Sequence, residues 1–273
     1  MNEGSVGESV CTPSIPGYEF VEPLGEGGTG VVYRAVRLAD QEPVAVKLLH
    51  PALIDPRQPR FWDRESRLMA AVKHPNLVSV YDAGEIDGQA YLVMEYVPGP
   101  SLRKFVVPGY PWPPQAAWLL INAVADALTA LHFRGILHLD LKPENILLRG
   151  GSAHGDAVKL TDFGLARGQH EVQSLAALDA VQSSMCYSSP EQRHGLPLDV
   201  RSDLFSLAVL TYELLTGRLP GRQYVPVRNK QPALGPLVDP LLQAALARDP
   251  AERPPSVESF RRDLAAALAG GEA

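Results

Sequence analysis

The chain has 273 residues, a length that allows one large domain or two lobes, and 45% of them are hydrophobic while 21% are charged. This composition excludes a wholly disordered or collagen-like chain. The 25 Lys and Arg residues against 31 Asp and Glu residues give a net charge of -6, so we expect no nucleic-acid partner of the usual basic kind. The two cysteines are too few for a disulfide framework and lack metal-ligand spacing, which favours a reducing cytoplasmic setting.

The first residues and the most apolar windows bear on secretion and membranes. Residues 1–15 are small and polar and predict a flexible leader without the basic and apolar parts of a secretory signal. The apolar windows 116–131 and 204–215 are interrupted or closed by polar residues and fall short of about 18 unbroken apolar positions, so we expect buried helices and no membrane segment. The sequence leaves open whether the chain is the cytoplasmic part of a longer membrane receptor.

Between residues 18 and 97 most signals are those of strands. Short β-rich runs bounded by Gly, Asp and Pro predict strands at 31–33, 44–46, 77–81 and 91–96. One helix is predicted from about residue 59 to 72. It stops before His74-Pro75-Asn76 because the residue that precedes a proline is pushed out of helical geometry.

After residue 100 the pattern becomes helical. Pro113 and Pro114 open a predicted helix that ends near Gly135. Short strands are predicted at 146–148 and 158–160, and further helices at 202–216, 236–248 and 256–268. The sequence therefore predicts an α+β protein in which a small, mainly β lobe joins a larger helical lobe near Val97, and a cleft between two lobes is a common place for a ligand.

A glycine-rich segment lies between two of the predicted strands. Residues 24–32 read LGEGGTGVV, with Gly25, Gly27 and Gly30 in G-x-G-x-x-G spacing. Glycines allow backbone N–H groups to approach phosphate oxygens without a Cβ in the way, although glycine triplets also make plain hairpins. A strand follows the glycines where a dinucleotide-binding Rossmann unit would open a helix, and this argues against that fold.

Two charged residues of the first lobe are candidates for holding phosphates. Lys47 ends the apolar run Val44-Ala45-Val46, and Glu65 lies in the predicted helix. A carboxylate at Glu65 can hold the Lys47 ammonium against ATP phosphates. The alternatives are a solvated strand end for Lys47 and an exposed helix face for Glu65.

The strongest chemical signal lies in two segments of the second lobe. Residues 136–148 read ILHLDLKPENILL and place His138, Asp140, Lys142 and Asn145 in a polar loop between apolar runs. Such a loop can aim a carboxylate at a substrate hydroxyl. Residues 159–166 read KLTDFGLA, where Asp162 offers a second oxygen ligand, and two hard oxygen ligands with substrate phosphates are how Mg²⁺ is usually held.

The ordered set of motifs resembles the eukaryotic-like serine/threonine protein kinases, especially their bacterial branch, over about residues 16–268. Further marks of the resemblance are His74-Pro75-Asn76, Ser189-Pro190-Glu191, Asp203 and Arg253. It implies a bilobal protein kinase fold with a mainly β N-lobe (16–96) and a larger α-helical C-lobe (97–268), between the leader 1–15 and a short tail, 269–273.

The resemblance also implies a role for each candidate residue. Asp140 is the expected catalytic base, Lys142 neutralises the γ-phosphate, and Asn145 and Asp162 ligate Mg²⁺ or Mn²⁺. Lys47, held by Glu65, contacts the ATP phosphates. The remaining nucleotide residues are expected in the glycine-rich segment, around the adenine and in the hinge: Leu24, Gly25, Glu26, Gly27, Gly28, Gly30; Val32, Ala45, Leu147; Met94, Glu95, Val97.

Two further expectations concern the segment 162–191. By resemblance, Glu191 and Arg253 form a buried ion pair, and the Ser184 hydroxyl meets Asp140 and Lys142. The segment contains Ser174, Ser183 and Ser184 but no Thr, and Leu139 replaces the Arg that usually precedes the catalytic Asp. This departure argues against control by a phosphorylated loop residue that pairs with that Arg.

The leading hypothesis is a bacterial signalling enzyme that transfers the γ-phosphoryl group of ATP to protein Ser or Thr hydroxyls and to itself. The alternatives are a pseudokinase or scaffold, which the intact catalytic set disfavours, and a small-molecule kinase, which the Ser-Pro-Glu motif and long activation segment disfavour. ATP and protein substrates are the expected partners, and dimerisation is left open.

Overall fold

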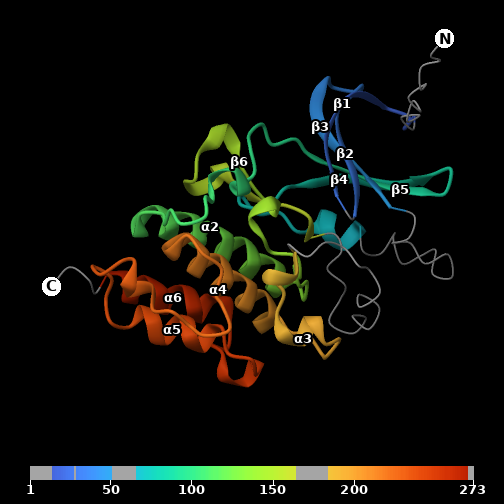
Figure 1. The fold of residues 1–273 in the computed structure, drawn as a ribbon. Helices are drawn as coiled ribbons and strands as arrows, with labels where there is room; N and C mark the ends of the chain where they lie inside the picture. Colours follow the sequence, from blue (N-terminus) through green and yellow to red (C-terminus); the bar gives the residue numbers. More distant parts are fainter. Residues whose placement is uncertain (1–13, 28, 51–65, 164–183, 270–273) are drawn as a thin grey trace, which may run out of the picture. The chain divides into compact units, whose positions relative to one another are not determined.

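A computed structural model describes residues 14–27, 29–50, 66–163 and 184–269. The chain packs as two units, one drawn from residues 1–62 and 80–96 and the other from residues 63–79 and 97–273. Figure 1 shows the strands of the first unit and the helices of the second, coloured along the sequence. The short segment 63–79, which includes the helical residues 66–71, belongs to the second unit.

The first unit is an antiparallel sheet of five strands in the order β1-β2-β3-β5-β4. The strands are β1 (Tyr18–Gly27), β2 (Gly30–Arg37), β3 (Glu42–Leu49), β4 (Val80–Ile86) and β5 (Gln89–Glu95). Neighbouring strands are joined by tight turns, except between β3 and β4. Strands β1 to β3 thus form a meander and β4 and β5 form a hairpin, with turns at 38–41 and 87–88, and β5 pairs with β3.

Alternation along β3 gives the sheet two apolar faces. Val44, Val46 and Leu48 point into one cluster with Ala35 and Val93, where aromatic residues of β1, β2 and β5 cover them. Ile15, one residue before the expected start of the folded domain, is buried in the same cluster, because a turn at Pro16-Gly17 returns the chain onto the sheet. The opposite face carries Ala45 and Lys47, which are also buried.

The strand predicted at 77–81 is wrong in its position. The amide of Val78 donates to the carbonyl of Leu160, and Leu77 forms an isolated bridge with Leu160, so this apolar run packs in the second unit. The strand that pairs with β5 begins at Val80 and continues to Ile86. Apolarity marked a buried segment here and did not distinguish a strand from a bridge.

The second unit is mainly helical (Figure 1). In addition to the helical residues 66–71, the described part of this unit has the α-helices α2 (Pro114–Phe133), α3 (Pro190–Arg193), α4 (Val200–Thr216), α5 (Val238–Ala245) and α6 (Val257–Ala269). A two-stranded ladder pairs β6 (Ile146–Leu148) with β7 (Val158–Leu160). Single 3₁₀ turns occur at Leu102–Phe105, Pro143–Asn145, Arg149–Gly151, Gly155–Ala157, Ser184–Cys186, Val227–Asn229 and Pro250–Glu252.

Helices α2, α4 and α6 pack on one another and form the core of this unit. From Ser202 to Thr216 every residue of α4 is buried; the helix begins at the N-cap Asp199 and ends at Gly217 with φ +70°, a left-handed cap. Among the described residues only α2 is long and apolar enough to cross a membrane by length and composition. Nine of its residues are buried against its neighbours, as expected for a core helix.

Candidate active site

The ladder of β6 and β7 brings the two polar segments of the second unit together. Ile146 lies opposite Leu160, and beyond this pair the Thr161 amide donates to the Asn145 carbonyl at 2.9 Å. Asn145, at the start of one strand, therefore lies beside the end of the other strand. Asp162 is the next residue after this contact.

Asp140 is the centre of a hydrogen-bonded cluster in the loop that precedes β6. The Lys142 ammonium donates to both carboxylate oxygens, at 2.9 and 2.8 Å, and the Asn145 Nδ2 donates to Oδ2 and to the Asp140 carbonyl, both at 2.8 Å. The Asp140 side chain is 31% exposed. The carboxylate is thus held by two donors and is still open to a substrate hydroxyl.

The orientation of the Asn145 amide suits it to a cation. Both described hydrogen bonds of this buried side chain use Nδ2 as the donor. The carbonyl oxygen Oδ1 is therefore the atom that could bind a metal ion. Asp162 adopts φ +65°, a left-handed conformation that Asp tolerates better than most residues. An amide oxygen and a carboxylate are the hard oxygen donors that Mg²⁺ prefers.

Asp203 of α4 holds the backbone of the loop that carries Asp140. Its fully buried carboxylate accepts from the amides of His138 and Leu139, at 2.8 and 2.7 Å, and lies 2.7 Å from Nε2 of His132. Burial raises the pKa of Asp203, but the hydrogen bonds from His132 and the loop amides outweigh burial and hold the pKa below its ordinary value. The ionised carboxylate therefore fixes two consecutive peptide groups.

His138 is a neutral imidazole with a defined tautomer. The Asp140 amide donates to Nδ1 at 3.2 Å, and Nε2 lies 3.0 Å from the Thr161 carbonyl oxygen, so Nε2 carries the proton. Complete burial lowers the pKa of His138, and the nearby carboxylates only partly oppose this. The ring joins the loop to the end of β7.

Leu139 has no polar role for its side chain. It is buried among Leu137, Leu198 and Val200, although its backbone has φ +62°. A left-handed conformation costs a non-glycine residue about 1–2 kcal/mol, so the surrounding contacts have to hold it. The position where relatives usually carry Arg is here an apolar anchor.

In the first unit four of the predicted nucleotide residues, Val32, Ala45, Lys47 and Met94, share one face of the sheet. Val32 lies opposite Lys47, and Ala45 lies opposite Met94. Residues opposite one another in an antiparallel ladder lie on the same face, and Ala45 and Lys47 are two residues apart. Lys47 is buried and shares this face with Val32, Ala45 and Met94.

The glycines of the β1–β2 hairpin differ in what demands them. Gly30 has φ +140°, and a Cβ there would lie 1.9 Å from the Leu48 carbonyl oxygen, so the fold itself requires glycine. Gly25 and Gly27 are exposed, and a Cβ on either would meet nothing within 4 Å. Packing does not explain these two glycines, whereas the close approach of a phosphate would.

The other predicted site residues fall in three groups. Leu24 and Glu26 are exposed on β1, and Glu95 ends β5. Val97 is buried in the second unit, where Leu147 forms a bridge with Ser101. The third group lies outside the described part of the chain and consists of Gly28, Glu65 and the Ser184 side chain. The predicted pair of Lys47 and Glu65 therefore also lies outside it.

Comparison with known proteins decides the family. The family model of the protein kinase domain matches residues 18–259. The chain belongs to the protein kinase family. Its fold is the protein kinase fold, and its TM-score against the crystal structure of the PknI kinase domain of Mycobacterium tuberculosis is 0.74, at 29% identity over 93% of this chain and 96% of that one.

Curated relatives are bacterial serine/threonine-protein kinases. Pkn2 of Myxococcus xanthus is 38% identical over 92% of this chain and 32% of its own length, and PknB of Mycobacterium leprae is 38% identical over 90% and 42%. PrkC of Bacillus subtilis is 31% identical over 92% and 40%. The kinase domain described here thus spans about a third to a half of the length of such relatives.

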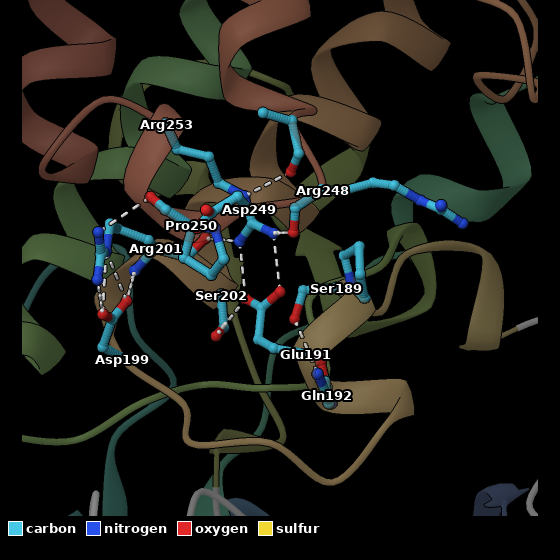
Figure 2. Close-up of polar contacts among 12 residues, drawn as sticks. Ser189, Glu191, Gln192, Asp199, Arg201, Ser202, Arg248, Asp249, Pro250 and Arg253 are labelled. Carbon is cyan, nitrogen blue, oxygen red and sulfur yellow. Dashed lines mark hydrogen bonds and ion pairs between the residues drawn. The ribbon is translucent and has the colours of Figure 1, made fainter.

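The predicted pair of Glu191 and Arg253 is confirmed in this kinase domain (Figure 2). Arg253 donates to both Glu191 oxygens at 2.7 Å, and the Ser202 hydroxyl donates to Oε1 at 2.8 Å. Burial raises the pKa of Glu191, but the Arg253 hydrogen bonds outweigh burial and lower it. The pair fixes α3 against α4 and the 3₁₀ turn Pro250–Glu252 that precedes α6.

Sequence reasoning missed the contacts that hold the catalytic loop. Asp203 was recognised only as a family mark, and His132 and Gln192 not at all. The Gln192 side-chain amide donates from Nε2 to the Leu139 carbonyl at 2.6 Å. No local pattern announces such partners, since 53 and 64 residues separate Leu139 from Gln192 and Asp203.

Proposed function

We propose that this kinase domain is a serine/threonine protein kinase that transfers the γ-phosphoryl group of ATP to Ser and Thr hydroxyls of proteins, itself included. The observation that carries the proposal is the Asp140–Lys142–Asn145 cluster, whose side chains are already joined by hydrogen bonds beside Asp162. The names of the bacterial relatives support the acceptor class.

Asp140 accepts the proton of the acceptor hydroxyl and orients it for attack. Its carboxylate is partly exposed, and its backbone is fixed through His138 and Asn145, so the base is preorganised. Lys142, which donates to Asp140 in the structure, supplies a positive charge that stabilises the negative charge of the phosphoryl group during transfer. Little covalent chemistry is needed from the protein, because phosphoryl transfer depends mainly on positioning and charge.

Asn145 and Asp162 are the proposed metal ligands, and Mg²⁺ or Mn²⁺ is the proposed ion. The ion would neutralise charge on the ATP phosphates. The donor set fits, since Asn145 Oδ1 is left as an acceptor and Asp162 is a carboxylate on the residue after Thr161, which pairs with Asn145.

The remaining proposed residues are candidates for contacting the nucleotide. Lys47 and Glu65 are the proposed phosphate-anchoring pair, and Gly25 and Gly27, which are exposed, are proposed to let backbone N–H groups approach the phosphates. The other proposed contacts are apolar surfaces for the adenine and backbone groups of the hinge: Leu24, Glu26, Gly28, Gly30, Val32, Ala45, Leu147, Met94, Glu95 and Val97.

The setting of the reaction follows from the substrates. We propose that this domain acts in the cytoplasm, where ATP and protein acceptors are available, either alone or as the cytoplasmic part of a longer receptor, and that it can form homodimers. A scaffold role or a small-molecule kinase activity is the competing proposal. Both are decided by the same assay.

The decisive experiment is incubation with labelled ATP and Mg²⁺, with and without a generic basic protein, followed by phosphosite mapping. We expect phosphoserine and phosphothreonine, and loss of label without a divalent ion. Asp140→Asn should lower turnover by at least about 100-fold, because the base is lost, while nucleotide affinity stays within about twofold. Wild-type turnover in this variant, or label on sugars or amines in place of protein, would contradict the proposal.

A further inference from the structure

Two peptide groups flank Leu139, the strained residue before Asp140, and side chains from elsewhere hold both of them. The amide on the N-terminal side donates to Asp203 Oδ1 at 2.7 Å. The carbonyl on the C-terminal side accepts from Gln192 Nε2 at 2.6 Å. Because φ of Leu139 is +62°, rotation of the peptide plane on its N-terminal side would relax the strain, and the bond to Asp203 opposes that rotation, while the bond from Gln192 fixes the plane on the other side.

The peptide group that Gln192 holds is the one that carries Asp140. Its C=O belongs to Leu139 and its N–H to Asp140, which donates to His138 Nδ1 at 3.2 Å. One plane is therefore clamped at both ends, by Gln192 on the oxygen and by His138 on the hydrogen. The orientation of this plane sets the direction of the Asp140 side chain, since the plane directly precedes its Cα.

Gln192 can hold this plane firmly because α3 is itself anchored. Its own amide donates to the Ser189 hydroxyl at 3.3 Å, and the adjacent Glu191 is locked by Arg253 and Ser202 (Figure 2). Of the described contacts to the backbone of residues 138–140, the one from Gln192 comes from α3, directly after the segment 162–191. The others come from Asp203 of α4, or from His138 and Asn145 within residues 138–145.

The remaining polar atom of Gln192 indicates that its donor matters. Oε1 is buried and meets no hydrogen-bond partner among the described residues. A buried acceptor without a partner costs about 1–3 kcal/mol, a cost that an apolar side chain of the same length would avoid. Stability alone therefore does not favour an amide at this position, whereas a requirement for the bond to Leu139 does.

We infer that Gln192 is a positioning residue of the phosphoryl-transfer reaction, which orients Asp140 by holding the Leu139 carbonyl. The direction of the Asp140 carboxylate then depends on the position of α3. This inference rests on the proposed function. Gln192 contacts neither substrate nor nucleotide. Its loss should lower the rate of the chemical step and leave nucleotide binding unchanged.

The test is the kinetics of Gln192→Met, which keeps the side-chain length but removes the donor. We expect kcat to fall between about 10- and 100-fold, because a small misplacement of a catalytic group is costly, while KM for ATP stays within about twofold. Gln192→Glu is nearly isosteric and is the second variant. Its carboxylate cannot donate to a carbonyl, so it should lower kcat at least as much.

Gln231→Met is the matched control. Gln231 also donates from Nε2 to backbone carbonyls, those of Trp112 and Leu215 at 3.1 and 3.4 Å, but far along the chain from the catalytic loop. We expect it to change the melting temperature without changing kcat.

The outcomes separate this inference from the proposed function. Folded Gln192 variants with kcat within about twofold of wild type, or an equal fall in Gln231→Met, would overturn the positioning role and leave the kinase activity standing. A change in KM alone would overturn it as well. A wild-type protein that transfers no phosphate would overturn the proposed function, and this inference with it.

Discussion

At the scale of single residues, the glycines of the β1–β2 hairpin separate the demands of the fold from those of a ligand. Gly30 meets the Leu48 carbonyl and has a left-handed φ, so any side chain there is both crowded and strained. Gly25 and Gly27 have neither constraint within the protein. The same residue type in one motif thus has two physical causes, which substitution can distinguish.

The prediction is that Gly27→Ala and Gly30→Ala fail in different ways. Gly27→Ala should keep the melting temperature of wild type but raise KM for ATP several-fold, because its Cβ occupies the path of the phosphates. Gly30→Ala should lower the free energy of unfolding by at least about 1–3 kcal/mol from backbone strain alone. Thermal melts and ATP titrations measure both. An unchanged KM in a stable Gly27→Ala protein would show that this glycine has no ligand role.

At the scale of elements, α3 is a helix of one turn that cannot be stable by itself. Its position depends on the buried Glu191–Arg253 pair, and on Ser202, which donates to the same carboxylate. Arg253 also stacks over Phe205, with 4.9 Å between the guanidinium carbon and the ring centroid. The charges are fully compensated, so removing one partner leaves the other buried without compensation.

We therefore predict that Glu191→Gln or Arg253→Met lowers the free energy of unfolding by about 3–5 kcal/mol, measured by urea denaturation. The double variant Glu191→Met/Arg253→Met should lose less than either single variant suggests, since no charge remains unpaired. Arg262→Ala, which removes a partner of the exposed Asp263, is the control and should change stability by less than about 0.5 kcal/mol. Equal effects at the buried and exposed pairs would contradict the argument.

The same scale shows how much could be predicted from the sequence. Helical periodicity with proline starts placed α2, α4, α5 and α6 within a few residues of their ends. The run at 77–81 was misplaced because apolarity reports burial and not pairing. The single turn α3 was not predicted as a helix, because four residues carry no periodicity.

For the candidate site, the sequence could predict the residues proposed to act on the substrate, but not the residues that hold them in position. Asp140, Lys142 and Asn145 lie within six positions and form one cluster, so their spacing was informative. Asp203 and Gln192 act through long-range contacts with backbone groups, and backbone groups have no residue-specific signature. Only the tertiary fold shows such partners.

At the scale of the whole molecule, the question is how activity is controlled. In relatives with Arg before the catalytic Asp, a phosphorylated loop residue neutralises a buried guanidinium and so orders the loop. Here the side chain of Leu139 is buried among Leu137, Leu198 and Val200 and carries no charge. Asp203 and Gln192 already hold the backbone of Leu139, so the loop that carries Asp140 keeps its geometry without a phosphate.

We predict that this kinase domain keeps most of its activity after phosphatase treatment, and likewise in the double variant Ser174→Ala/Ser183→Ala. A phosphate on the loop has no cation at position 139 to pair with, so its removal changes no contact of Asp140. The measurement is initial rate on a generic protein substrate before and after dephosphorylation, with the phosphorylation state followed by mass spectrometry. Ser184 is kept intact, because its hydroxyl is itself a proposed neighbour of Asp140.

The comparison protein is Leu139→Arg, whose new guanidinium has no partner in the apolar cluster, so it should lose stability and activity even when phosphorylated. A fall of about tenfold or more in the wild-type rate on dephosphorylation, restored by autophosphorylation, would show that loop phosphorylation controls this kinase through a residue other than the one before Asp140.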